Sequence, residues 1–385
     1  MKKVMLIDGS AISKSPKGVG RYTEHLVRQL SDKLPRDWRL VILMHERDVD
    51  LFFGDREVRI IYIPERYDLF RGFVLTPLWA VVSQAQVVLV PMDVAASAAG
   101  RPLISVIHGI SELIRAATED QRNWRRRVID AVREWGRRRT LRKASIVVCN
   151  SEFVRDEAER RYRIEKNRMR IGYCAVDPRF YERDLRPSLE IWPQIAQWSG
   201  YLLAAATGDP YERYDLCPGV LQALKSEFPT AGMVIFGVRR EADYARELVE
   251  DFSRKGLVEG RDYLLIPFLG SEEFQALRAL YRGADFYLEL SEHEGFGMQL
   301  VEAMATGATC ISSGRAALHE VGGGFAVEVE RLDGECVAET IAEAYRRKLH
   351  QRNNRDQIEY TRKFNWDAVG DTISGEAVRL LGEER

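Results

Sequence analysis

Cysteine is scarce in this sequence, and its spacing excludes two kinds of cross-linked site. The five cysteines, which are odd in number, widely spaced and without a C-x-x-C pair, are Cys149, Cys174, Cys217, Cys310 and Cys336. Such spacing indicates neither a zinc site nor a disulfide framework. We therefore expect a protein of the reducing cytoplasm.

Long apolar runs and an excess of charge of either sign are also absent. No apolar stretch approaches the 18 residues of a membrane-spanning helix. The start, MKKVMLIDGS, is too short in apolar residues for a signal peptide and suits a first buried strand. The formal net charge of −1 gives no global field that would attract nucleic acid. We expect no nucleic-acid partner, and any membrane contact should be at the surface.

The composition and the apolar pattern predict a two-domain α/β protein. The 385 residues, 45% hydrophobic and 30% charged, fit a soluble globular protein too long for one ordinary core. Short apolar runs alternate with helical segments in both halves, which predicts two doubly wound domains with parallel sheets. We expect a first domain over 1–186, a proline-interrupted linker over 187–199, a second domain over 200–365, and a C-terminal helix over 366–385. This helix can cross back to the first domain, but the sequence leaves its docking open.

The segment SEHEGFGMQLVEAMATG, residues 291–307, follows an apolar strand and opens a helix. Ligands of such sheets lie beyond the carboxyl ends of the strands. Gly295 and Gly297 allow close approach of the backbone to a ligand, and the amides that open the helix suit a phosphate. Glu294 on the loop suits sugar hydroxyls, and Glu302 in the helix suits a ribose diol. The pattern predicts a nucleotide-sugar site. The alternative is an ordinary glycine-bearing loop with one capping and one surface glutamate.

This segment resembles the E-x7-E signature of retaining glycosyltransferases with the GT-B fold, in the group 1, family 4 class that includes mannosyltransferases. Further segments resemble that family in the expected order: GVGRYTEHLVRQL, SVIHGI, VVCNSEFVRDE and VDPRFY. The resemblance implies two facing Rossmann-like domains with a cleft between them. It also implies transfer of a sugar, with retention, from a nucleoside-diphosphate sugar to a hydroxyl of a glycan or lipid-linked acceptor, as in polysaccharide biosynthesis. GDP-mannose is the favoured donor and a UDP-hexose is the other option.

The resemblance also implies which residues form the site. His108 follows the strand LISVI and is expected beside the transferred sugar, as a catalytic residue together with Glu294. The expected donor contacts are Gly18, Gly20, Arg213, Arg239, Gly295, Phe296, Gly297, Met298 and Glu302. A structural histidine and an ordinary turn before a capped helix are the alternatives for His108 and for the first-domain glycines.

No cofactor and no metal ion are expected. The first glycine loop does not read G-x-G-x-x-G, which argues against a nicotinamide. The triplet DVD at 48–50 resembles a metal-binding D-x-D, but so short a pattern arises readily by chance.

The sequence departs from the family at one phosphate-contacting loop. Similar enzymes usually carry an Arg-Lys pair where TGDPYERYD places Tyr211 and Glu212. Either Arg213 or Arg239 meets the diphosphate instead, or the donor is bound differently or not turned over. The reversal favours a competing hypothesis, a non-catalytic scaffold that binds a nucleotide-sugar or glycan. A nucleotide-sugar epimerase or a phosphorylase on a similar fold is a further alternative.

A basic segment runs from Arg122 to Lys143, with Trp124 and Trp135 interleaved. One interpretation is a solvated helix face, the usual form of a charge run. The other is a surface for anionic lipid or a lipid-linked acceptor, which would make the protein peripheral at the inner face of a membrane. The sequence leaves both open.

Overall fold

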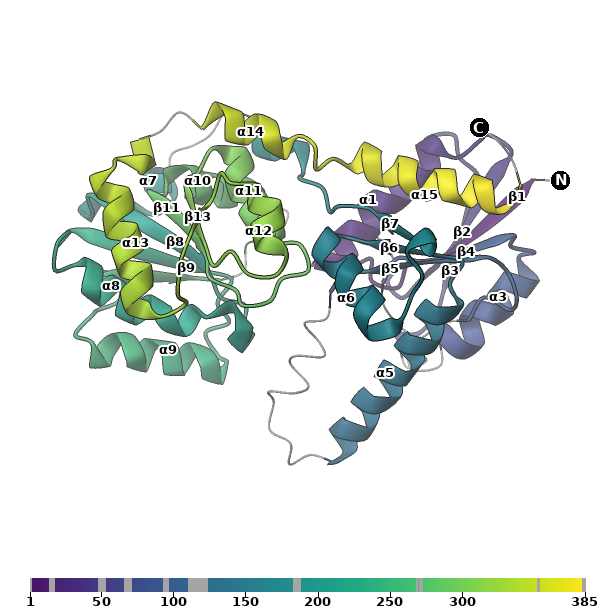
Figure 1. Ribbon diagram of the computed structural model, residues 1–385, viewed down its shortest axis with the longest axis horizontal. Coiled ribbons are helices and arrows are strands. Elements are labelled where there is room, and N and C mark those ends of the chain that lie inside the picture. The colour runs from purple at the N-terminus through teal and green to yellow at the C-terminus, as the bar shows by residue number, and fades with distance from the viewer. Residues whose placement is uncertain are drawn as a thin grey trace. The chain divides into compact units, whose positions relative to one another are not determined.

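The chain folds into two compact α/β units, shown in the computed structural model of Figure 1. Unit 1 comprises Met1–Ala175 and Phe364–Arg385, and unit 2 comprises Val176–Lys363. The described residues are 2–13, 18–47, 53–65, 71–92, 97–109, 124–182, 188–267, 269, 273–351 and 354–382.

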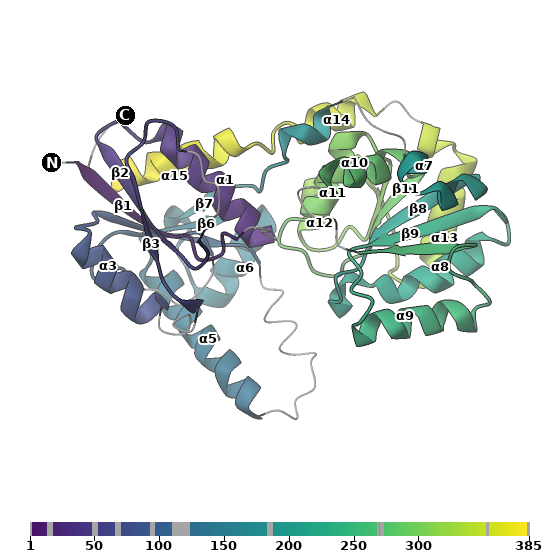
Figure 2. The ribbon, with the colours of Figure 1, turned by 180° about the vertical axis from the view of Figure 1, so that it is seen from behind.

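In the described part of unit 1, seven parallel strands form one sheet in the order β3-β2-β1-β4-β5-β6-β7. The strands are β1 (Lys3–Asp8), β2 (Trp38–Met44), β3 (Val58–Tyr62), β4 (Val87–Val90), β5 (Leu103–Ile107), β6 (Ile146–Cys149) and β7 (Met169–Ile171). The helices are α1 (Gly18–Lys33), a π-helical turn η2 (Arg71–Leu75) continued by α3 (Thr76–Val82), α5 (Trp124–Lys143), α6 (Glu152–Tyr162) and α15 (Trp366–Leu380), with 3-10 turn η3 (Lys166–Arg168). Helices α1 and α15 pack together on one face, and α3, α5 and α6 lie on the other (Figure 2).

In the described part of unit 2, six parallel strands follow the order β10-β9-β8-β11-β12-β13. The strands are β8 (Gly200–Ala205), β9 (Ala231–Phe236), β10 (Tyr263–Ile266), β11 (Phe286–Glu289), β12 (Cys310–Ser312) and β13 (Val327–Glu328). The helices are α7 (Ser188–Ile191), α8 (Cys217–Leu224), α9 (Asp243–Arg254), α10 (Phe274–Gly283), α11 (Met298–Thr306), α12 (Ala317–Gly322), α13 (Gly334–Arg346) and α14 (Arg355–Thr361). Short 3-10 turns are η4 (Pro178–Tyr181), η5 (Pro193–Gln197), η6 (Pro210–Glu212), η7 (Tyr214–Leu216) and η9 (Leu349–Gln351).

Burial on both faces of each sheet explains why the strands are continuously apolar. All four residues of β4, VVLV, are buried, as are all six of β9, AGMVIF. Helices α8, α9 and α13 cover one face of the second sheet, and α10, α11 and α12 cover the other (Figure 1). The predicted α/β class with two doubly wound parallel sheets is confirmed.

The structure corrects the predicted linker over 187–199, because the described residues from 188 onward belong to unit 2. Trp198 is buried, and its Nε1 donates a hydrogen bond to the carbonyl of Arg261 at 2.6 Å. Its indole covers Gly232 on β9, where an added Cβ would come within 1.9 Å of the ring. Pro193 opens the turn η5. The prolines therefore mark turns in a packed segment, and unit 1 ends at Ala175 rather than at 186.

The C-terminal helix α15 packs on α1 of unit 1, which settles the docking that the sequence left open. The rings of His25 and Trp366 stack with centroids 4.5 Å apart. Gly370 permits a close approach, because a Cβ there would lie 2.8 Å from the Cβ of Gln29. Lys33 ends α1 and pairs with Asp371 at 3.1 Å.

Each sheet has a topological switch point, where successive connections depart in opposite directions. In unit 1 it lies between β1 and β4, and in unit 2 between β8 and β11. Open α/β sheets bind ligands in the crevice beyond the carboxyl ends of the strands at such a point. The loops that follow these four strands are therefore the places where chemistry is expected.

Candidate functional site

The loop between β11 and α11 has the glycine-dependent geometry that the sequence predicted. Gly297 has φ of +87°, and a Cβ there would lie 2.5 Å from the Leu318 side chain. Only glycine fits both conditions. The loop is fixed to the segment that follows β12, since Ser313 Oγ donates to the carbonyl of Ser291 at 2.6 Å. Helix α11 then begins at Met298, so its first amides open at the switch point of the sheet.

The two glutamates of the motif have different surroundings. Glu294 is half-buried on the loop, and its pKa is raised well above the usual value, first by desolvation and then by the charges of Glu289 and Glu212. Glu302 is buried inside α11, where its Oε2 accepts a hydrogen bond from Tyr281 Oη at 3.5 Å. Glu294 is thus the more accessible of the two. Its raised pKa favours the neutral acid, which can donate as well as accept a hydrogen bond.

Two other residues of the motif, Phe296 and Met298, have different positions. Phe296 is buried, with 3% of its surface exposed. Met298 is half-buried and is the first residue of α11. Phe296 therefore shapes the loop from inside, and the amides on either side of Met298 remain the groups suited to an anion.

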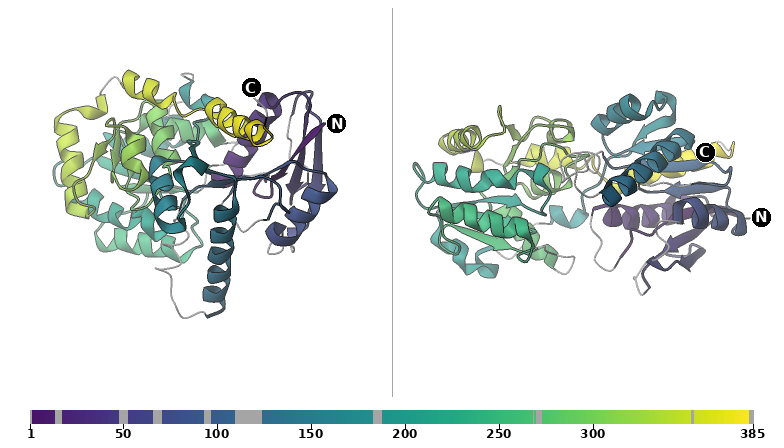
Figure 3. Two further views of the ribbon diagram at one scale, coloured as in Figure 1. Left: turned by 45° about the vertical axis from the view of Figure 1, so that its right-hand side comes forward. Right: turned by 90° about the horizontal axis from the view of Figure 1, so that it is seen from below.

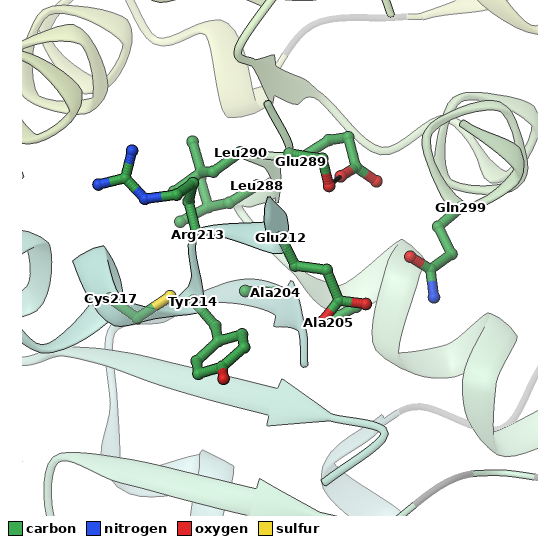
Figure 4. Close-up of a pocket in the computed structure, with 11 residues that line it drawn as sticks. Ala204, Ala205, Glu212, Arg213, Tyr214, Cys217, Leu288, Glu289, Leu290 and Gln299 are labelled. Atoms are coloured by element: carbon green, nitrogen blue, oxygen red, sulfur yellow. Dashed lines mark hydrogen bonds between the residues drawn. The ribbon is translucent and has the colours of Figure 1, made fainter. Parts of the chain in front are cut away.

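A pocket lies against this loop and is lined by Glu289, a residue that was not predicted from the sequence. The empty space is about 290 Å³, including the part open to solvent. It is lined by Ala204, Ala205, Glu212, Arg213, Tyr214, Cys217, Leu288, Glu289, Leu290, Ser291 and Gln299 (Figure 4). Glu289 is buried at the end of β11 and accepts hydrogen bonds from Ser291 Oγ at 2.7 Å and Tyr287 Oη at 3.0 Å. The sequence signal that could have identified Glu289 is an acid at the end of the apolar run that begins at Phe286.

The loop after β8 shows what replaces the family's basic pair. The Glu212 carboxylate accepts hydrogen bonds from the backbone N–H of Thr207 at 2.8 Å and of Gly208 at 3.3 Å, and from Thr207 Oγ1. Gly208 has φ of +105°, and a Cβ there would clash with the Tyr244 ring at 2.6 Å. Desolvation raises the pKa of Glu212 to about 7. The amides that open this loop are therefore bound by the protein's own carboxylate.

Arg213 and Arg239, the two predicted substitutes for the basic pair, differ in what they contact. Arg213 donates from Nε to Asp215 Oδ1 at 3.0 Å and from Nη1 to Glu292 Oε1 at 2.7 Å. Its guanidinium points away from the Glu212 carboxylate (Figure 4). Two carboxylates thus already neutralise Arg213.

Arg239 follows β9 and is exposed, with its guanidinium beside the β8 loop. Its Nη2 donates to the carbonyl of Thr207 at 3.3 Å, and it lies over the Tyr244 ring. Within the described ranges, no carboxylate forms an ion pair with it. Of the two arginines, Arg239 is the one whose charge is available to a ligand at Thr207 and Gly208.

In unit 1, His108 lies at the carboxyl end of β5, as predicted, in a well-defined set of contacts. Its Nε2 lies 3.0 Å from the carbonyl of Pro91, and its ring meets the edge of the Tyr22 ring with centroids 4.6 Å apart. Asn150 Nδ2 donates to the carbonyl of His108 at 2.8 Å. The histidine is therefore held by the ends of neighbouring strands and by α1.

The predicted glycines of unit 1 lie at the start of α1. Gly18 is exposed as the first residue of that helix, and Gly20 is buried two residues later. Residues 14–17 of the same loop, and the DVD triplet at 48–50, lie outside the described residues. Across the described chain, no cluster of three or more His, Cys, Asp or Glu side chains has metal-binding geometry.

A buried ionic cluster at the switch point of unit 1 was not predicted. Arg71 Nε lies 3.0 Å from Asp8 Oδ2, and both side chains are buried. Arg71 Nη1 lies 3.1 Å from His45 Nε2. Asp8 ends β1, His45 follows β2 and Arg71 begins η2, so three distant segments meet there. Asp8 could have been selected as the end of a strand, but nothing in the sequence pairs it with Arg71.

Two parallel α/β units, with a glycine loop and a helix start at the second switch point, define a protein of the GT-B class. The Glycosyltransferase Family 4 model matches residues 16–180, and the Glycosyl transferases group 1 model matches residues 206–347. The chain belongs to the group 1 glycosyltransferases of the family 4 type.

Similar proteins agree with this class. The chain is 26% identical over 215 residues to the O-antigen chain mannosyltransferase B of Escherichia coli, covering 53% of this chain and 52% of that protein. It thus spans about half the length of the curated relative it matches. Sucrose-phosphate synthase from Thermosynechococcus elongatus has a similar structure, with a TM-score of 0.73 at 15% identity over 99% of this chain and 100% of that one. The Anabaena protein Alr3699/HepE, solved with UDP-glucose, gives 0.68 at 16% identity over 98% of this chain and 100% of that one.

Proposed function

We propose that this protein transfers a sugar, with retention, from a nucleoside-diphosphate sugar to a hydroxyl of a glycan or lipid-linked acceptor. The observation that carries the proposal is the β11–α11 loop, which places Glu294 and the first amides of α11 together at the switch point of unit 2. Membership of the family supports it. A nucleotide-sugar has hydroxyls at both ends and phosphates between them, which matches this order of groups.

The residues of unit 2 have distinct roles in the proposal. Glu294 holds the sugar, Glu302 holds the ribose, and the amides around Met298 with Arg239 meet the diphosphate. The leaving group gains negative charge in the transition state, so donors that are already in place stabilise it. This arrangement needs no metal ion, because the helix amides and Arg239 supply the positive charge.

Retention fits attack on the same face of the sugar as the departing diphosphate. In this mechanism the leaving phosphate accepts the proton of the acceptor hydroxyl, and no carboxylate nucleophile is required. We place His108 of unit 1 beside the transferred sugar, where its contact with the carbonyl of Pro91 fixes the ring. Gly18 and Gly20 at the start of α1 are proposed to contact the donor's diphosphate.

GDP-mannose is the favoured donor, and a UDP-hexose is the second choice. The similarity to a mannosyltransferase supports the first, and the UDP-glucose complex of the Anabaena protein supports the second. The test is incubation of the protein with GDP-mannose, UDP-glucose and related donors, each with a panel of glycan and polyprenyl-phosphate acceptors. Released nucleotide and the anomeric configuration of the product are measured. Release of nucleotide only with acceptor, with retained configuration, is expected; turnover of no donor would contradict the proposal.

A non-catalytic scaffold is the second candidate, and one observation favours it. The carboxylate of Glu212 occupies the amides of Thr207 and Gly208, where a basic pair would otherwise serve a phosphate. A scaffold would bind a sugar nucleotide in the same experiments without releasing nucleotide from any donor.

We also propose that unit 1 contacts an anionic membrane surface, which makes the protein cytoplasmic and peripheral. Helix α5 carries nine Lys or Arg against two acids, so its formal charge is +7 in a chain whose total is −1. It projects from the sheet of unit 1 in Figure 3. Each Lys or Arg near an anionic surface adds about 1 kcal/mol of attraction.

An apolar surface beside α5 supports the membrane proposal. Seven large apolar side chains, each more than half exposed, form this α3–α5 surface: Val74, Leu78, Val81, Val82, Val128, Val132 and Trp135. The ring of Phe73, next to Val74, lies 6.1 Å from that of Trp135, which joins the two helices. Large exposed apolar residues that gather on neighbouring segments can mark an interaction site. Among the described residues, no helix is long and apolar enough to span a bilayer.

Sedimentation with phosphatidylglycerol vesicles tests this surface. We expect binding that weakens in high salt, and loss of at least about tenfold in affinity in Leu78→Ser/Val81→Ser, since each burial contributes about 1–2 kcal/mol. Val258→Ser removes an equally exposed valine from unit 2 and serves as the control. Equal binding by the Leu78→Ser/Val81→Ser variant and the Val258→Ser control, or binding to neutral vesicles alone, would show that this surface does not bind anionic lipid. Self-association without lipid would instead assign it to a second copy.

A further inference from the structure

The carboxylate of Glu212 stands where an anionic ligand would stand. It accepts from two consecutive backbone amides, at 2.8 Å and 3.3 Å, and from the hydroxyl of Thr207. Oxygen atoms of a phosphate are bound by consecutive amides in the same way. The amides belong to the loop that follows β8, one of the two strands that flank the switch point. The position is therefore part of the ligand crevice and not a remote turn.

The groups facing Glu212 are mostly acidic, so its ionised form is poorly compensated. Asp209, Tyr211 and Tyr214 lie on its own loop, and Glu289 and Glu294 lie at the end of β11 and on the loop that follows. Arg213, the adjacent cation, is turned toward Asp215 and Glu292. Arg239 reaches the carbonyl of Thr207 from the end of β9. While Glu212 is ionised, the acidic groups around it repel a second anion, whereas the two amides and Arg239 attract one.

We propose that Glu212 is an internal competitor for the diphosphate of the donor, so that a sugar nucleotide occupies the Thr207–Gly208 amides only when the carboxylate is displaced or protonated. This inference rests on the proposed function and adds a control to the same site. The charge reversal relative to the family is then not a loss of the site. It makes donor binding compete with an intramolecular contact.

Donor binding becomes coupled to proton uptake near neutral pH. The pKa of Glu212 is raised to about 7, chiefly by desolvation. A diphosphate that enters the crevice adds negative charge and favours the neutral acid still further. Neutral Glu212 no longer needs the amides as strongly and can donate a hydrogen bond to a phosphate oxygen. Affinity for the donor should therefore fall as pH rises through 7.

Calorimetric titration with GDP-mannose and UDP-glucose tests the inference. Their diphosphates are diesters, which do not titrate in this range, so the protein supplies the pH dependence. Between pH 6.5 and 8.0 the protonated fraction of a group with pKa about 7 falls about eightfold, and the wild-type affinity should fall by a similar factor. Titration at pH 7.5 in two buffers of different ionisation enthalpy should show net proton uptake.

Substitution separates Glu212 from the other acids in the crevice. Glu212→Gln keeps an oxygen that can accept from the amides but removes the charge. It should bind the sugar nucleotide about tenfold more tightly than wild type at pH 8, and the pH dependence should largely disappear. Guanosine and uridine, which lack phosphate, should bind both proteins alike. Glu227→Gln, at an exposed carboxylate paired with Arg346, serves as the charge control and should match wild type.

The outcomes distinguish the inference from the function on which it rests. If the wild-type affinity is independent of pH, or if Glu212→Gln binds no more tightly than wild type at pH 8, Glu212 does not compete with the diphosphate. The proposed donor site would be unaffected by that result. Binding of neither sugar nucleotide to either protein at any pH overturns the proposed function itself. If Glu212→Gln does not fold, proton uptake by the wild-type protein still decides the question.

Discussion

The two loops at the switch point of unit 2 use the same backbone device in opposite ways. The loop after β11 ends at Gly297 and opens the amides of α11. The loop after β8 also presents amides, at Thr207 and Gly208, but the protein's own Glu212 occupies them. A glycine conformation that exposes amides therefore does not by itself make an open anion site. The amides are open to a ligand when no side chain of the same loop accepts their hydrogen bonds, and they are closed to it when one does.

The largest expected effect comes from the open loop. Glu294→Ala should lower transfer by at least about 100-fold, because the sugar loses the group that positions it. Stability should change little or rise, since the removed carboxyl is poorly solvated. Turnover is measured with the preferred donor, and unfolding is followed by circular dichroism. Full activity in a folded Glu294→Ala protein would remove this loop from the site.

Next in size is the contrast between the two arginines. Arg239→Gln should raise the KM for the donor about tenfold, since a charge-assisted hydrogen bond contributes about 1.5–3 kcal/mol. Arg213→Gln should change KM by less than about threefold, because Asp215 and Glu292 already hold Arg213. Steady-state kinetics on both variants at one pH measures the difference. The reverse order would mean that Arg213 leaves its carboxylates when the donor binds.

A smaller effect concerns the glycine that opens α11. Gly297→Ala should destabilise the fold by about 1–3 kcal/mol, because φ is positive and the Cβ would meet Leu318 at 2.5 Å. Gly324→Ala is the matched control, with φ of +78° and nothing within 4 Å of the added Cβ. It should cost about 1 kcal/mol at most. Urea unfolding compares the two, and equal losses would show that the contact with Leu318 relaxes without cost.

The smallest effect is on stability against pH at the self-occupied loop. Folding raises the pKa of Glu212 from 4.5 to about 7, so its ionisation costs stability as pH rises through that range. Glu212→Gln lacks this cost. Its advantage over wild type should grow by about 2 kcal/mol between pH 5 and pH 7 and then level off. A constant difference across this range, measured by thermal unfolding, would contradict the raised pKa.

The sequence predicted those parts of the fold that have a clear period or a long apolar run. A helix was predicted to open within the segment 291–307, and α11 covers Met298–Thr306 there. Strands β7 and β13 have only three and two residues, which is too few to show an apolar period in the sequence. The linker was wrong because prolines mark turns in packed segments as well as in linkers.

The site was predictable where one segment carries it and not where segments meet. The loop with Glu294 and Gly297 could be placed because strand, turn and helix follow one another in the chain. The contact between Glu212 and the Thr207–Gly208 amides depends on how a short loop turns back on itself. The Asp8–Arg71–His45 cluster joins three segments across the sheet. Neither has a periodic signal that sequence alone could show.

A crystal structure of the protein soaked with GDP-mannose tests the central claim most directly. We expect the nucleotide at the β8–β11 switch point, with phosphate oxygens within about 3.2 Å of the first amides of α11, and the Glu212 carboxylate withdrawn from Thr207 and Gly208. A nucleotide bound elsewhere in the chain, or bound there with no phosphate at the α11 amides, would contradict it.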